Sequence, residues 1–159
     1  MSDSWDAFAS ALYDESMELR RVHDLAVRLT QALVKRDIGE ISNAERSLDD
    51  ARKVYQAASG RRRGMQVRGF GTLTLRQVCA YAPRHMWPVL NQRVVELTTT
   101  SISLGITNNN NKALIMNGMT RLMKVTAALQ KAASDGPGTY KRRGFIPPPT
   151  NSVLVSSKA

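Results

Sequence analysis

One row of residues with strict helical spacing constrains this chain more than any other feature of its sequence. Between Leu90 and Leu129, successive members of the row are alternately four and three positions apart. This spacing is typical of the seam of a long coiled-coil helix. The row consists of Leu90, Val94, Leu97, Ser101, Leu104, Asn108, Asn111, Ile115, Gly118, Leu122, Val125 and Leu129. A long helix followed by a polar tail suits the binding of another protein better than it suits catalysis.

Two shorter helices are expected before the long one. Residues 4–35 contain no Gly or Pro and repeat apolar residues at three- and four-residue intervals, with Asp3 or Ser4 as the N-cap. A second helix is expected over residues 40–59, after a tight turn in which Gly39 is the expected helix breaker. Because the connection is so short, the two helices should form an antiparallel hairpin.

The segment between the hairpin and the long helix is rich in Gly and Arg. A loop is expected from Gly60 to about Gly71, followed by a short segment over residues 72–81 that could be helix or strand. The long helix should cover residues 88–133, with Pro88 tolerated in its first turn. Within this helix, the run Asn108–Asn111 could be buried and set the register of the coiled coil, could be solvated, or could break the helix locally.

These elements predict an all-α fold, an antiparallel three-helix coiled-coil bundle over residues 1–134 with a flexible C-terminal tail. The tail, residues 135–159, contains three consecutive prolines and no apolar period, so it should be disordered until it binds a partner. Aromatic residues make up only 6% of the 159 residues, which fits a thin bundle better than a thick globular core. The seam of the long helix would also suit a homodimer.

Composition argues against a disulfide-bonded, a secreted or a membrane-spanning protein. The single Cys79 excludes an internal disulfide, and no apolar run approaches the roughly 18 residues that a membrane span requires. The N-terminus is acidic and lacks the features of a signal peptide, so a cytoplasmic location without membrane insertion is expected. Residues 1–59 contain 8 Lys/Arg and 11 Asp/Glu, whereas residues 60–159 contain 15 Lys/Arg and 2 Asp/Glu. The positive surplus could meet an acidic protein, a membrane surface or nucleic acid.

No group of residues predicts catalysis, metal binding or a cofactor. Cys79 and His85 lack a third orienting group, so a small buried thiol and an unrelated histidine are expected. His23 should lie on the surface, and the carboxylate pairs Asp14–Glu15 and Asp49–Asp50 should be solvated.

Two basic runs, Arg61–Arg63 and Lys141–Arg143, could bind a phosphate backbone. Alternatively, each run could lie in a solvated loop or contact acidic helix faces. Few aromatic residues accompany them, which argues against nucleic acid binding.

Three local motifs resemble the FlgN family of flagellar export chaperones. The turn ALVKRDIGEI resembles the turn between that family's first two helices. The block from Asn109 to Ile115 resembles an Asn- and Leu-containing stretch of its last helix, and the segment from Gly138 to Gly144 resembles the Tyr-containing motif just after it. The resemblance extends over about residues 8–145, although Arg61–Trp87 does not align and the family is less basic overall.

The resemblance implies a cytoplasmic, non-enzymatic chaperone. Such a protein binds the hook–filament junction proteins FlgK and FlgL, prevents their early assembly and delivers them to the export gate protein FlhA. Tyr140 corresponds to the family's tail tyrosine, which is associated with the gate contact.

Amphipathic client helices need an apolar groove. The residues expected to supply it are Ile115, Met119, Leu122, Val125 and Leu129 of the long helix, with Phe145, Ile146, Val153 and Leu154 of the tail as further anchors. The alternatives are a basic helical protein that binds RNA or DNA, and a chaperone or adaptor for a different secreted helical protein.

Overall fold

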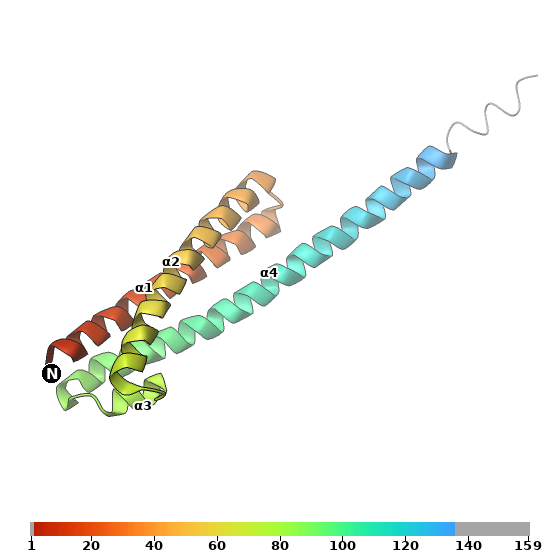
Figure 1. The fold of residues 1–159 in the computed structure, drawn as a ribbon. Helices are drawn as coiled ribbons and strands as arrows, with labels where there is room; N and C mark the ends of the chain where they lie inside the picture. The colour runs from red at the N-terminus through yellow and green to blue at the C-terminus, as the bar shows by residue number, and fades with distance from the viewer. Residues whose placement is uncertain (1, 136–159) are drawn as a thin grey trace, which may run out of the picture. The chain divides into compact units, whose positions relative to one another are not determined.

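The computed structural model describes residues 2–135, and all of its regular structure is helical. The elements are α1 (Ser2–Lys35), α2 (Ile38–Phe70), α3 (Leu75–Ala80), the 3-10 turn η1 (Arg84–Met86) and α4 (Trp87–Asp135) (Figure 1). The all-α class predicted from the sequence is therefore confirmed. No helix within these residues is both long enough and apolar enough to cross a membrane.

The hairpin of α1 and α2 is closed by two residues, and neither is the glycine expected to break the helix. Arg36 adopts a left-handed conformation with φ of 59°, and the amide of Asp37 donates to the carbonyl of Ala32 at 3.2 Å. The Asp37 side chain then accepts from the amide of Glu40 at 3.0 Å and caps α2. The prediction that Gly39 ends a helix is wrong, because Gly39 lies inside the first turn of α2.

The second helix ends eleven residues later than the sequence predicted. It was expected to end at Ser59, with a loop from Gly60, but α2 continues without interruption to Phe70. Three glycines in this stretch weaken the helix by roughly 1 kcal/mol each. Buried packing of Ala58 and Arg62 on the same side of the helix opposes that loss.

The short segment after α2 is helical. Thr74 caps α3: its amide donates to the Gln77 side chain at 2.8 Å, and its hydroxyl accepts from the Gln77 amide at 3.3 Å. This reciprocal capping box decides between the helix and the strand that the sequence left open. Pro88 falls in the first turn of α4, as expected.

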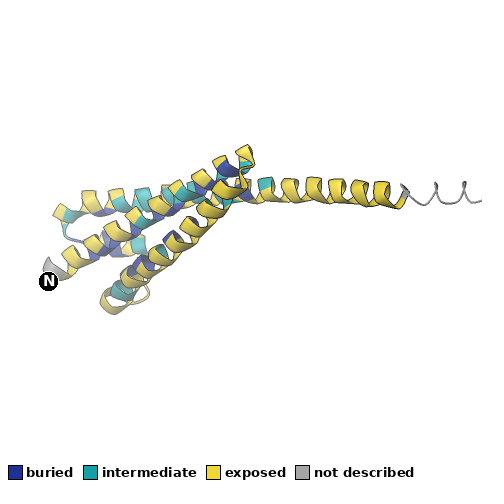
Figure 2. Cartoon of the chain, turned by 90° about the horizontal axis from the view of Figure 1, so that it is seen from above, coloured by how far each residue is buried: buried dark blue, intermediate teal, exposed yellow. Residues whose placement is uncertain are grey.

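Among the described residues, those up to Asn117 form one compact unit and those from Gly118 onward belong to a second, with α4 contributing to both. Within the first unit, α4 runs parallel to α1, because Arg93 lies over the Tyr13 ring at 4.6 Å and Thr107 lies 3.5 Å from His23. Figure 2 shows the buried positions of this unit on the sides where its helices face one another.

Two hydrophobic clusters hold the first unit together. One joins the start of α1 to α3 and the start of α4, and its buried members are Phe8, Leu12, Val78, Cys79, Ala82 and Leu90. The other lies within the hairpin, with Leu104 of α4 packed against it, and its buried members are Val22, Ala26, Leu29, Leu48 and Ala51. The small residues Ala26 and Ala51 let α1 and α2 approach closely.

Candidate functional site

The seam of α4 changes character along its length. Leu90 is fully buried, and Val94, Leu97 and Leu104 are half-buried against the two hydrophobic clusters. The first half of the seam therefore packs within the first compact unit.

The asparagine run lies within an unbroken helix, which excludes a local break. Asn111 is buried: its amide nitrogen donates to the carbonyl of Ala26 at 3.0 Å, and its side-chain oxygen accepts from the Thr30 hydroxyl at 2.7 Å. Asn109 and Asn110 are exposed, while Asn108 is half-buried. One asparagine of the run is thus buried and ties α4 to α1 through both its amide nitrogen and its oxygen.

Beyond Asn111, the apolar residues of the seam are exposed. Ile115, Met119, Leu122, Val125 and Leu129 are between 37% and 67% exposed. At about 100° per residue, they fall within about 120° of arc on α4. Leu90, Leu97 and Leu104 belong to the same arc, so the helix face that is covered earlier in α4 is uncovered here. Every residue from Gly118 to Ser134 is exposed, as Figure 2 shows.

The charged residues of α4 that accompany this exposed apolar row are all basic, although Glu45 and Asp49 of α2 lie near its first residue, Ile115. No Asp or Glu occurs between Leu97 and Ser134, whereas Lys112, Arg121, Lys124 and Lys131 do. A partner helix laid along the row would therefore be favoured if acidic side chains flank its own apolar face. The tail residues expected to take part, Tyr140, Phe145, Ile146, Val153 and Leu154, lie outside the described residues, as does the run Lys141–Arg143.

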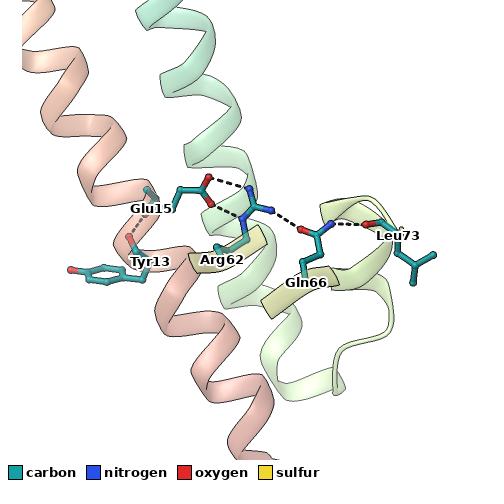
Figure 3. Close-up of polar contacts among 6 residues, drawn as sticks. Tyr13, Glu15, Arg62, Gln66 and Leu73 are labelled. Carbon is teal, nitrogen blue, oxygen red and sulfur yellow. Dashed lines mark hydrogen bonds and ion pairs between the residues drawn. The ribbon is translucent and has the colours of Figure 1, made fainter. Parts of the chain in front are cut away.

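The most developed polar site joins Glu15, which was expected to be solvated, to Arg62, for which contact with an acidic helix face was one of the expected alternatives. Glu15 and Arg62 are both buried and form a two-pronged ion pair, with Nε donating to Oε2 at 2.6 Å and Nη2 to Oε1 at 3.0 Å. Arg62 also donates to the Gln66 side chain at 2.6 Å, and Gln66 donates to the carbonyl of Leu73 (Figure 3). The network links α1 to α2 and to the loop that precedes α3.

The spacing of apolar residues in the sequence already indicates that Glu15 and Arg62 both occupy buried helix positions. Glu15 is three residues after Leu12 and four before Leu19, so it occupies a seam position of α1. Arg62 follows Ala58 by four residues and precedes Met65 by three, which continues the seam of α2. The expectation that Glu15 is solvated is wrong, because seam position rather than residue type decides its burial.

The remaining titratable groups are dispersed. Cys79 is a buried thiol whose pKa is raised by that burial, with Arg62 opposing the shift more weakly. His85 is exposed and His23 is half-buried. Asp49 and Asp50 are exposed, each paired with a cation three residues on. Within residues 2–135, no three His, Cys, Asp or Glu side chains are grouped as metal ligands would be.

Comparison with known proteins identifies no relative of this chain. No protein family, no curated protein and no solved structure matches the chain significantly.

Proposed function

We propose that this protein is a cytoplasmic export chaperone that binds flagellar hook-associated proteins, prevents their premature assembly and delivers them to the export gate. The observation that carries the proposal is the exposed apolar row of α4, from Ile115 to Leu129. The motif resemblance to the FlgN family supplies the identity of the clients, FlgK and FlgL, and of the gate protein, FlhA. In this proposal α1, α2 and α4 serve as an antiparallel three-helix coiled coil with a flexible tail.

An amphipathic helix of a client would lie along the row. Covering a half-exposed Leu, Val or Met side chain stabilises a complex by roughly 1 kcal/mol or more. Five such side chains supply on the order of 5–10 kcal/mol before the costs of association are subtracted. The net binding free energy left after those costs suits a complex that must later be released. In this proposal, release needs no nucleotide.

The tail has two roles in the proposal. Phe145, Ile146, Val153 and Leu154 would extend the apolar surface, and Tyr140 would contact the export gate. Removing the chain from Gly138 onward should weaken client binding while leaving helical content largely intact. Tyr140→Ala should impair gate binding more than client binding, and an equal loss of both would make Tyr140 a client anchor instead.

The first test is a pull-down with the tagged full-length protein from its native lysate, with nuclease treatment and high-salt washes. Hook-associated proteins recovered in near-stoichiometric amount would support the proposal. A different secreted helical protein would keep the chaperone role and replace the client. Retention of nucleic acid alone, lost at high salt, would favour the alternative of an RNA- or DNA-binding protein.

A matched pair of variants locates the contact. Leu122→Asp places a charge in the exposed row, whereas Ile106→Asp places the same charge at another exposed apolar position of α4, about half a turn away from the row. Client affinity measured by calorimetry should fall at least tenfold for Leu122→Asp and change little for Ile106→Asp. Equal effects of the two variants would remove the row from the proposal.

A further inference from the structure

A second apolar surface lies in the first compact unit and shares no residue with the α4 row. It is a pocket of about 770 Å³ between the start of α1, the end of α2 and the segment that follows α2. Its lining includes Trp5, Phe8, Met65, Phe70, Leu73 and Tyr81. The volume is within the range of protein pockets that bind ligands or side chains.

The walls of the pocket hold one another in place. The Trp5 and Phe70 rings lie with their centroids 4.8 Å apart, and Phe8 meets Phe70 edge-on at 5.8 Å. Phe8 is fully buried, whereas Tyr81 is 70% exposed. The pocket is therefore preformed, with a rigid aromatic floor and an exposed tyrosine at its rim.

The part of the chain that runs from α2 past the pocket into α4 carries only positive charge, whereas the α1 segment that contributes to the lining includes the exposed Asp6. From Ala51 to Val95 the sequence contains nine Arg or Lys and no Asp or Glu. Six of these arginines are exposed. Arg52 pairs with Asp49, and the other five are Arg61, Arg63, Arg68, Arg76 and Arg84. None of the five forms an ion pair with a carboxylate within the described side chains, and Arg68 is part of the pocket lining.

We propose that this pocket is a second docking surface, and that it binds an acidic protein segment carrying an aromatic or branched aliphatic anchor. A concave apolar floor accepts an inserted side chain, and the guanidinium of Arg68 can bind a neighbouring carboxylate through two hydrogen bonds. A nucleic acid base would need a flat exposed ring to stack on, and the floor of the pocket offers none, because Phe8 is buried and the Trp5 and Phe70 rings pack against each other. The Tyr81 ring at the rim is exposed, so an oligouridylate is one arm of the test. The two surfaces would let the protein hold two partners at once.

The glycines of α2 permit a test that fills the pocket without disturbing the fold. Gly69 lines the pocket, and a Cβ added there meets nothing within 4 Å. Gly69→Leu should fill the mouth of the pocket, while Gly60→Leu, equally free of contacts but outside the lining, is its matched control. Arg68→Glu reverses the charge at the pocket, and Arg46→Glu does so at an exposed position elsewhere on α2.

The probe is a short fluorescein-labelled peptide rich in Asp and Glu with two Phe residues, compared with the same peptide carrying Ser in place of Phe. Fluorescence anisotropy with the full chain should show the Phe peptide binding at least tenfold more tightly than the Ser peptide. Gly69→Leu and Arg68→Glu should each weaken its binding about tenfold, and both control variants should bind as the parent does. In a Trp87→Phe background, binding should change the emission of Trp5, which reports contact at the pocket itself.

Three outcomes would overturn the proposal. The first is that the Phe and Ser peptides bind equally well. The second is that Gly69→Leu does not change peptide binding although its circular dichroism is that of the parent. The third is that an oligouridylate of equal charge binds more tightly than the Phe peptide and that Arg68→Glu abolishes the binding of the oligouridylate. The last result would assign the arginines to nucleic acid. None of these outcomes bears on the α4 row, whose variants are measured separately.

Discussion

Replacing Arg62 with Ala removes the cation from a carboxylate that solvent does not reach. Glu15 is 1% exposed and both of its oxygens are bonded by Arg62, so Arg62→Ala leaves Glu15 buried without its partner. Breaking a buried pair in this way costs about 3–5 kcal/mol. With an unfolding entropy of about 2.1 cal/mol/K per residue over the 117 residues of the first unit, Tm should fall by about 12–20 °C.

The assay is urea and thermal unfolding followed by circular dichroism at low protein concentration. Arg63→Ala is the control, because Arg63 is the exposed neighbour and its loss should change stability by no more than about 0.5 kcal/mol. The double variant Glu15→Leu with Arg62→Met replaces the pair by apolar side chains and should recover most of the lost stability, or exceed the parent. A loss below about 1 kcal/mol for Arg62→Ala, or a double variant no more stable than the single one, would refute the reasoning.

Three further predictions concern single residues. Asn111→Ala removes the bonds to Ala26 and Thr30 and should destabilise the protein by about 1–3 kcal/mol in urea unfolding, with faster hydrogen exchange around α4 residue 111. Arg36→Gly relieves the left-handed conformation at the hairpin turn and should raise the free energy of unfolding by about 0.5–1 kcal/mol; no gain would mean that the turn is not strained. Because burial raises the pKa of Cys79, its thiol should react slowly with a disulfide reagent in the folded protein. Since the unfolded chain ionises first, the contribution of Cys79 to stability should decline as pH rises above the ordinary thiol value, a decline that Cys79→Ala should abolish.

The fold was predictable where apolar spacing is long and uninterrupted. α1 and α4 begin and end within about two residues of their predicted bounds. The end of α2 was not predictable in this way. The low helix propensity of Gly60 and Gly64 suggested a loop, whereas tertiary contacts of Arg62 keep that turn helical. Propensity is a weak prior when a buried side chain anchors the same turn.

The candidate site was predictable in part. Spacing placed the apolar row of α4 on one face, but spacing does not distinguish a covered face from an exposed one, since Leu104 and Leu122 occupy equivalent positions and only Leu122 is exposed. The buried role of Asn111 was one of three open interpretations, and only the position of Ala26 and Thr30 decides between them. The pocket around Trp5 and Phe70 was not foreseen, because residues about 65 apart in the chain form it.

The exposure of α4 from Gly118 to Ser134 has a thermodynamic consequence for any partner that binds there. Side chains that touch little else add little to helix stability, so this stretch depends on backbone hydrogen bonds and intrinsic propensity, which support isolated helices of such length only marginally in water. Gly118, Val125 and Thr126 weaken it, and the alanines that follow strengthen it. Its helical population should therefore fall steadily on warming, without a cooperative transition. A partner that requires the helix would then bind with a more negative enthalpy and with an affinity that decreases as temperature rises.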